Sequence, residues 1–295
     1  MSGRHIEPSE LIITERGTIY HIDIAPEHLA PTVITVGSPD RVKEVSKYFD
    51  KIEHRAQHRE FITHTGYVAN RRISVISTGI GVGNIDIVLN EIDALMNIDL
   101  ATRTINEHKT SLSIIRLGTC GTLQADVPVD SMIVSTYAMG LDNLMLFYDM
   151  EVNAAQQELL AAFAQHIATT GKNIHPYICE GAAELRSHFT DGYVHGITVT
   201  CPGFYGPQGR TLRLQPAFPH ILDALASFGH KGHRVANFEM ETSAIYGMGA
   251  LLGHKCLSIS TAVANRATKT FSADTDRAVD NMIRQSLQVI ADNDL

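Results

Sequence analysis

The chain has few of the features that mark metal-binding, disulfide-rich or membrane proteins. Its 295 residues include no tryptophan and only four cysteines, which are Cys120, Cys179, Cys201 and Cys256. They form no CxxC pair, so a zinc site or a disulfide framework is poorly supported and buried free thiols are expected. No apolar run is long enough to span a bilayer, and residues 1–17 lack the apolar core of a signal peptide. We therefore expect a cytoplasmic protein without a membrane partner.

Positive charge is also scarce. The chain has 24 lysines and arginines against 32 aspartates and glutamates, for a formal net charge of -8. This excess repels a polyanion, so nucleic acid is not an expected partner, whereas a small anion can still bind to local arginines. Close histidine pairs such as His54 with His58 lack the acidic or cysteine partners of a zinc site. No metal is assigned from the histidines.

Alternating apolar runs and amphipathic segments predict an α/β fold. A β-branched run at 32–36 and a strand at 72–77 are each followed by a turn and a helical pattern. Further strands are expected at 113–117, 131–138, 197–200 and 255–263, and further helices at 153–169, 242–252 and 275–291. No linker composition interrupts the chain, so one domain over residues 19–295 is predicted behind a leader of residues 1–18. Its core is a mixed, mainly parallel central sheet flanked by helices.

Functional residues of such sheets gather where strands end. The segment Gly37-Ser-Pro-Asp-Arg41 follows a strand and opens a helix. Backbone N–H groups and Arg41 can therefore face an anion, which predicts a phosphate cradle. An ordinary helix start capped by Ser38 or Asp40 explains the same residues.

Two further arginines stand in positions that suit an anion. Arg116 ends an apolar strand and precedes a predicted Gly-Thr-x-Gly turn, in which the Thr119 hydroxyl suits an oxyanion. A structural salt bridge is the alternative for Arg116. Arg59 lies in Gln57-His-Arg-Glu-Phe61, for which a solvated turn is the alternative.

The glycine-rich segment Gly79 to Asn84 invites a dinucleotide interpretation. Its sixth position is Asn84, however, where the GxGxxG fingerprint requires glycine or alanine. A tight strand-to-helix turn that lines a pocket is favoured instead, and no cofactor is expected.

Two segments have side chains that suit a nucleoside. Glu239-Met-Glu241 places paired carboxylates before a helix, where they can accept hydrogen bonds from a vicinal sugar diol. Acids favoured by the dipole at a helix start are the alternative. Phe204 to Arg210 sets Gln208 and Arg210 beside aromatic rings, so this loop can match the donor and acceptor edge of a lactam such as uracil while Phe204 packs on its face. A generic surface loop is the alternative.

Taken in order, six segments resemble the nucleoside phosphorylase-I family: VGSPDR, QHREF, STGIGVGN, IRLGTCG, FYGPQGR and NFEMET. FYGPQGR is similar to the uridine phosphorylase branch of that family, and the resemblance extends from about Ile19 to Ile290. It implies a partly barrel-like sheet and cleavage of a pyrimidine ribonucleoside such as uridine by phosphate, the co-substrate. A homodimer is the implied minimal unit, with a hexamer built as a trimer of dimers as a further option.

The resemblance also implies roles for single residues. The implied phosphate ligands are Gly37, Arg41, Arg116, Thr119 and, from the neighbouring subunit, Arg59. The implied ribose site contains Thr119, Glu239, Met240, Glu241 and His21, which also crosses the interface. The implied base site contains Cys120, where many relatives have threonine, together with Gly121, Phe204, Gln208, Arg210 and Arg266. Catalysis is expected from Arg41, Arg116, Glu241 and Arg210.

Two positions differ from family members. Purine-specific members carry an aspartate at the position of Ala264, so its absence favours a pyrimidine, as does Asn265-Arg266. Some uridine phosphorylases bind a monovalent cation at the interface; Glu60 and Ile80 match that site, but Asn84 replaces its serine and no metal is assigned. Residues 99–110 form a longer segment than in compact relatives, and no role is predicted for it.

The resulting hypothesis is phosphorolysis in which phosphate stabilises a cationic ribose, while Gln208 and Arg210 stabilise the departing uracil. Three alternatives stay open at this point. They are a purine nucleoside phosphorylase, a hydrolytic nucleosidase on the same fold, and a nucleoside-binding protein without catalysis.

Overall fold

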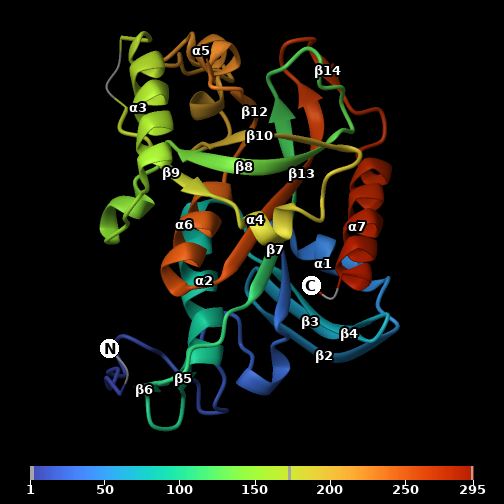
Figure 1. Cartoon of the computed structure of the whole chain (residues 1–295). Helices are drawn as coiled ribbons and strands as arrows, with labels where there is room; N and C mark the ends of the chain where they lie inside the picture. The colour runs from blue at the N-terminus through green and yellow to red at the C-terminus, as the bar shows by residue number, and fades with distance from the viewer. Residues whose placement is uncertain (1–2, 172–173, 294) are drawn as a thin grey trace.

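The computed structural model describes residues 3–171, 174–293 and 295, so that residues 1–2 of the predicted leader lie outside the described residues. Within them the chain forms one large mixed sheet, part of which closes into a barrel, with helices on the outside (Figure 1). In this part of the chain no helix has the length and apolar character needed to cross a membrane.

Five strands form the barrel. In order around it they are β7 (Ser113–Thr122), β13 (Lys255–Asn265), β8 (Met132–Gly140), β10 (Tyr193–Thr200) and β12 (His233–Glu239). The ring closes because β12 pairs antiparallel with the end of β7, with Phe238 opposite Gly121 and Asn237 opposite Thr122. The interior is packed by small side chains from four of these strands, which are Cys120, Ile133, Ala236 and Ala262. The partly barrel-like, mixed sheet is confirmed.

Four strands continue the sheet beyond β7. In order they are β1 (Thr32–Val36), β4 (Arg71–Ser77), β3 (Phe61–Val68) and β2 (Lys51–His58). β1 runs parallel to both β7 and β4, whereas β4, β3 and β2 are antiparallel to one another. The remaining short strands are β5 (Ile98–Asp99), β6 (Thr104–Ile105), β9 (Tyr177–Glu180), β11 (Gly229–His230) and β14 (Thr270–Phe271).

The predicted Gly-Thr-x-Gly turn after residue 117 is wrong. β7 continues through it to Thr122, because β13 supplies a parallel partner along its whole length and β12 supplies an antiparallel one at its end. Glycine serves close approach here: a Cβ on Gly121 would lie 2.9 Å from Cζ of Phe238. β2 and β3 were not predicted, since β2 alternates exposed and half-buried residues and buries none of them fully.

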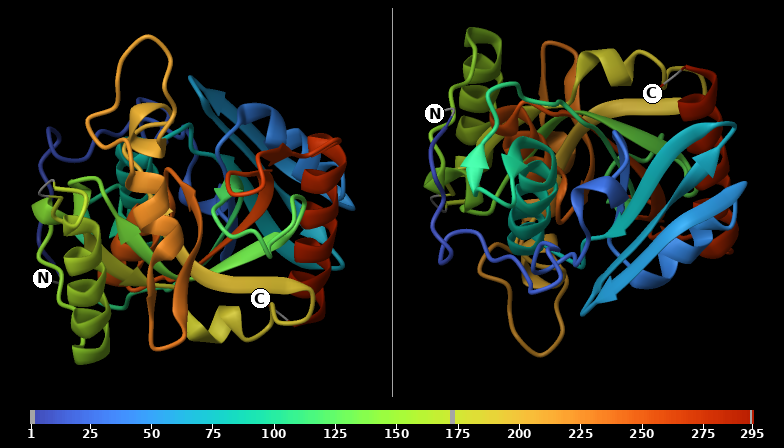
Figure 2. Two further views of the ribbon diagram at one scale, coloured as in Figure 1. Left: turned by 90° about the horizontal axis from the view of Figure 1, so that it is seen from above. Right: turned by 90° about the horizontal axis from the view of Figure 1, so that it is seen from below.

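Helices cover both faces of the sheet. They are α1 (Pro39–Ser46), α2 (Val82–Asn97), α3 (Ala154–Ala168), α4 (Ala183–Arg186), α5 (Ile221–Ser227), α6 (Thr242–Leu252) and α7 (Thr275–Asp292). Short 3₁₀ helices are η1 (Pro26–His28), η2 (Leu144–Phe147) and η3 (Gly206–Gln208). The helices predicted at 153–169, 242–252 and 275–291 are confirmed to within a residue at each end. α2 and α6 lie together on one side, while α7 lies beside α1 on the other (Figures 1 and 2).

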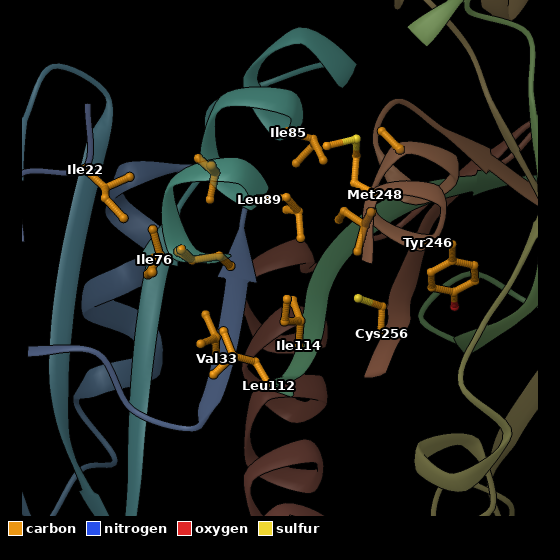
Figure 3. Close-up of a cluster of buried hydrophobic side chains, with 14 of the residues drawn as sticks. Ile22, Val33, Ile76, Ile85, Leu89, Leu112, Ile114, Tyr246, Met248 and Cys256 are labelled. Carbon is orange, nitrogen blue, oxygen red and sulfur yellow. The ribbon is translucent and has the colours of Figure 1, made fainter. Parts of the chain in front are cut away.

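The largest apolar cluster lies where α2 and α6 meet the sheet. Figure 3 shows Ile85 and Leu89 of α2 facing Met248 of α6, with Ile114 of β7 below them. Burying such side chains stabilises the fold by about 25 cal/mol per Å² of apolar surface. This packing holds the first turns of both helices at the end of the barrel.

The leader and the segment after α2 pack on each other. Residue Gly3 donates its N–H to Ile105 O, and Ile6 donates to Arg103 O, so the leader runs beside the β5–β6 hairpin. Asn97 holds the other end of this segment through hydrogen bonds with both N and O of Thr110. The long segment 99–110 therefore holds the leader in place by hydrogen bonds. The leader precedes His21 in the chain.

Tyr246 is a buried polar anchor of α6. Its hydroxyl donates to Ser135 O at 2.8 Å and accepts from the N–H of Ser258 at 2.9 Å, which joins α6 to β8 and β13. We predict that Tyr246→Phe lowers the free energy of unfolding by about 1–3 kcal/mol, because a buried N–H loses its partner. Urea unfolding of both proteins measures this. An unchanged midpoint would contradict the structural role.

Candidate active site

The centre of the site is a buried arginine between two carboxylates. Arg116 Nη2 lies 2.5 Å from Glu241 Oε2 and 3.2 Å from Glu239 Oε2, and its Nη1 donates to Ser260 Oγ. Burial alone lowers the pKa of Arg116, but the charges of the two glutamates outweigh it and raise that pKa. The guanidinium lies against Gly118, where it leaves no room for a Cβ. The salt bridge that was the alternative for Arg116 is present, and it joins the predicted site residues.

Glu239 is held entirely by the protein. Its oxygens accept hydrogen bonds from the N–H groups of Glu241 and Thr242 and from the hydroxyl of Thr200. Burial raises the pKa of Glu239, and Arg116 opposes that rise. Glu239 is the last residue of β12, and these donors make it a support for the segment that links β12 to α6.

Glu241 connects the glycine-rich segment to this centre. Its Oε1 accepts a hydrogen bond from Gly81 N at 2.8 Å, and its Oε2 binds Arg116. Gly81 has a φ of 93°, which glycine adopts without strain, and it precedes the first residue of α2. The segment thus presents the backbone N–H of Gly81 to a carboxylate, as a turn that lines the site. Met240, between the two glutamates, is half-buried.

Arg41 brings a second positive charge close to Arg116. Burial, and then the charge of Arg116, lower the pKa of Arg41. Its guanidinium forms no hydrogen bond or ion pair with any residue that the structure describes. Ser38, the residue before α1, makes no side-chain capping bond, so the helix-cap alternative is not realised there. A Cβ added to the nearby Gly37 would lie 3.6 Å from the carbonyl oxygen of Gly79. An anion between the arginines would satisfy both.

Thr119 and its neighbours line β7 beyond Arg116. The Thr119 side chain is half-buried, and its hydroxyl has no partner within the described residues. Cys120 is buried next to Asn237, and burial raises the pKa of its thiol to about 12, so the thiol is neutral at physiological pH. Gly121 lies against the ring of Phe238. These residues form one continuous strand wall.

The predicted pair in the loop after β10 lies together. Arg210 Nη1 donates to Gln208 Oε1 and to Phe204 O, both at 2.6 Å, and the Gln208 side chain is buried. The guanidinium carbon also lies over the Phe204 ring, 3.6 Å from the ring centroid. Arg210 therefore covers this face of Phe204. Residues 211–219, which follow, are mostly exposed and project from the body of the molecule (Figure 2).

Arg266 supports this loop from β13. Its Nη1 donates to Gln208 O at 3.2 Å, and its Nη2 lies 3.5 Å from Gly209 O. The side chain therefore holds the backbone of the predicted base-binding loop. Asn265 is committed to the protein as well, since its amide donates to Gln124 O and Val127 O.

Exposed Arg59 lies in a separate group with the half-buried side chains of Tyr20 and His21. Arg59 lies in the turn between β2 and β3 with a φ of 53°, and its guanidinium approaches the hydroxyl and ring of Tyr20. His21 Nδ1 lies 2.5 Å from Glu91 Oε1. The structure brings neither residue into contact with Arg41 or Arg116. Glu60 and Asn84, at two positions of the family's cation site, lie close together, because a Cβ on Gly79 would touch both of them. Ile80 is exposed.

Several residues of the centre were not predicted. Ser260 and Thr200 bond directly to Arg116 and Glu239, yet each is one of many small polar residues within an apolar strand. The available signal was position, since Thr200 is the last residue of a predicted strand. Asn237 was quoted only as part of a motif, although it is fully buried at the barrel closure.

Comparison with known proteins agrees with this arrangement. A family model described as the phosphorylase superfamily matches residues 31–292. The chain belongs to the phosphorylase superfamily. This membership confirms the resemblance to nucleoside phosphorylases that the motifs indicated.

Individual members of the superfamily match along nearly the whole chain. A nucleoside phosphorylase structure from Trypanosoma brucei, described as showing uridine phosphorylase activity, superimposes with a TM-score of 0.85 at 31% identity, covering 95% of this chain and 98% of that one. The uridine phosphorylase of Thermococcus kodakarensis is 28% identical over 281 residues, which is 95% of this chain and 90% of the relative. A purine nucleoside phosphorylase structure from Toxoplasma gondii has a TM-score of 0.66 at 20% identity over 95% of this chain and 98% of its own, a likeness of fold alone.

The close contact between the Arg116 guanidinium and Gly118 yields a prediction. Gly118→Ala places a methyl group inside the guanidinium, so Arg116 must leave its position between the glutamates. We expect phosphorolytic activity to fall by at least about a hundredfold, the size of effect typical of a lost charge-stabilising group. Steady-state kinetics measures the loss, with circular dichroism to confirm folding. A folded variant with full activity would contradict the role of Arg116.

Proposed function

We propose that this chain is a uridine phosphorylase, which uses phosphate to cleave uridine into uracil and ribose 1-phosphate. The observation that carries the proposal is Arg41, whose guanidinium forms no ion pair within residues 3–171, 174–293 and 295 and lies within range of the charges of both Arg116 and Glu241. A phosphate dianion would relieve the repulsion between the two arginines. The uridine phosphorylase activity named for the T. brucei structure supports the substrate.

In the proposed reaction phosphate lies against the anomeric carbon of the ribose. The bond from that carbon to uracil N1 breaks, and its electron pair leaves with the base. A phosphate oxygen forms the new bond to the same carbon. The ribose is cationic in between, so the bound dianion stabilises the transition state more than the ground state. Arg41 and Arg116 supply the positive charge that holds this dianion in place.

The departing base takes up negative charge, and the loop after β10 is suited to receive it. The guanidinium of Arg210 and the amide of Gln208 can turn from each other toward a uracil carbonyl and ring N–H. Arg266 holds the backbone of this loop in position by its hydrogen bond to Gln208 O. Uracil then collects its proton from water, so no buried acid is required. Ala264 has no proton to give.

Glu241 is our candidate for the ribose hydroxyls. Each of its oxygens already accepts one hydrogen bond, from Gly81 N or from Arg116, and each keeps a further acceptor site. A vicinal diol presents two donors at a matching spacing. Met240 can pack on the sugar beside it. Phosphate is the co-substrate of this reaction and no cofactor takes part, as expected for a cytoplasmic salvage enzyme.

We also propose that the active unit is a homodimer. Exposed Arg59 contacts half-buried Tyr20, whose ring lies beside that of His21, and none of the three bonds to Arg41 or Arg116 of its own subunit. A second subunit related by a two-fold axis would receive Arg59 and His21 in its phosphate and ribose sites. A hexamer of three such dimers is compatible with this contact.

A substrate panel tests the proposed function. Base release from uridine and inosine is measured with and without phosphate. We expect release of uracil that requires phosphate, at least about a hundredfold faster than release of hypoxanthine, since polar groups of the base site would be unpaired with a purine. Faster purine cleavage would make the protein a purine nucleoside phosphorylase. Release without phosphate would make it a nucleosidase, and uridine binding without turnover would make it a binding protein.

Mixing two inactive variants tests the shared site. Arg59→Ala and Glu241→Ala remove groups that the dimer hypothesis assigns to opposite contributions of one active site. After unfolding and refolding together in equal amounts, half-and-half dimers contain one intact site, so about a quarter of wild-type activity is expected to return. Each variant refolded alone is the control. Activity that never exceeds the controls would place Arg59 in its own subunit's site or outside any site.

A further inference from the structure

Behind the active site a buried carboxylate has no cationic partner. Asp142 lies just after β8 and is 5% exposed. Its oxygens accept hydrogen bonds from the hydroxyl of Tyr177 at 2.8 Å, from Leu144 N at 2.8 Å and from Ser243 Oγ at 3.3 Å. No lysine, arginine or histidine pairs with it in the described ranges. A buried carboxylate held only by neutral donors is costly, so its position calls for a role.

Asp142 is linked to Glu239 by two sets of hydrogen bonds that meet at Ser243, one at its hydroxyl and the other at its backbone N–H. Ser243 Oγ lies 2.9 Å from the Tyr177 hydroxyl, and Ser243 N donates to Thr200 Oγ1 at 2.9 Å. Thr200 Oγ1 in turn donates to Glu239 Oε1 at 2.9 Å. All of these side chains are buried, and they come from four different elements, β9, α6, β10 and β12. We call Asp142, Tyr177, Ser243 and Thr200 the supporting chain.

The direction of the last bond is set by the two partners of the Thr200 hydroxyl. Because the N–H of Ser243 occupies an acceptor side of the Thr200 hydroxyl, the hydroxyl proton points to Glu239. Ser243 belongs to the first turn of α6, which also donates Thr242 N to Glu239. Glycine at position 140 leaves space for the Tyr177 ring, because a Cβ there would overlap it.

Glu239 and Glu241 compete for the same nitrogen of Arg116. The Glu239 oxygen lies farther from it, at 3.2 Å against 2.5 Å for Glu241. A carboxylate that loses a hydrogen-bond donor keeps more of its negative charge for the nearest cation. Glu239 without the Thr200 hydroxyl would therefore draw Arg116 toward itself, and Arg116 would have less charge to offer a phosphate.

We propose that Asp142, Tyr177 and Thr200 are positioning residues that hold Glu239 back from Arg116 and so set the affinity of the site for phosphate. This inference rests on the proposed function for its substrate, but it concerns phosphate binding alone. None of the supporting chain touches substrate. Its effect is transmitted to phosphate through Glu239 and Arg116.

The test measures phosphate binding by calorimetry, together with the steady-state constants. Tyr177→Phe and Thr200→Val keep the shapes of their side chains and remove one hydroxyl each. We expect each to weaken phosphate binding about tenfold and to raise the KM for phosphate alike, with less than a twofold change in the KM for uridine, in the range seen when groups behind a site are removed. Tyr246→Phe is the matched control, because it removes a buried phenol hydroxyl whose hydrogen bonds go to Ser135 and Ser258, outside the supporting chain.

A double variant decides whether the residues act as one unit. If Tyr177 acts through Thr200, adding Tyr177→Phe to Thr200→Val weakens phosphate binding no further. Additive losses, or equal losses in Tyr246→Phe, would overturn the proposal and leave the chain a packing feature. A wild-type protein that binds phosphate but does not cleave uridine would instead refute the proposed function, and the calorimetric comparison would still decide this inference.

Discussion

One buried positive charge organises this structure. Arg116 is out of water, so it has to be neutralised and hydrogen-bonded where it stands. Two carboxylates, one at the end of β12 and one just before α6, and a serine of β13 meet this demand, while a glycine of its own strand leaves room for the guanidinium. Each partner is fixed in turn, Glu241 by Gly81 and Glu239 by Thr200 and the first turn of α6. Removing the charge would leave two buried acids facing each other without a cation.

Barrel closure is what makes this meeting possible. Arg116 and Glu241 are far apart in the chain, and only the short antiparallel contact between Gly121 and Phe238 brings the ends of β7 and β12 together. The same closure places the base loop after β10 beside the last residues of β13, where Arg266 reaches Gln208. The long sheet extension through β1 to β2 has a different task, since it carries Arg41 on one side and Arg59 on its outer turn.

Much of the fold and of the site could be predicted from the sequence, and the failures have a common cause. Apolar periodicity located β1, β4 and the three long helices, and the spacing of six motifs located the arginines and Glu241. Residues 118–122 looked like a turn because glycine and threonine favour turns locally, whereas pairing with β13 and β12 makes them strand. Glu239 looked equivalent to Glu241 until its donors were known. Asp142, Thr200 and Gly81 act through partners far away in the chain, which local patterns do not reveal.

The ion pair between Arg116 and Glu241 has one more consequence. Without a ligand, Arg116 and Glu241 form an ion pair with each other. The proposed phosphate subsite and ribose subsite are therefore joined by this one ion pair. In the proposed reaction, an anion that draws Arg116 away gives Glu241 Oε2 a second acceptor site for sugar hydroxyls, in addition to the one that each oxygen keeps in the ion pair. The substrate that binds first supplies most of the free energy needed to separate Arg116 from Glu241. By thermodynamic linkage, the affinity gained by the second equals the affinity that the first gains from it, so the two substrates bind with positive cooperativity within one site.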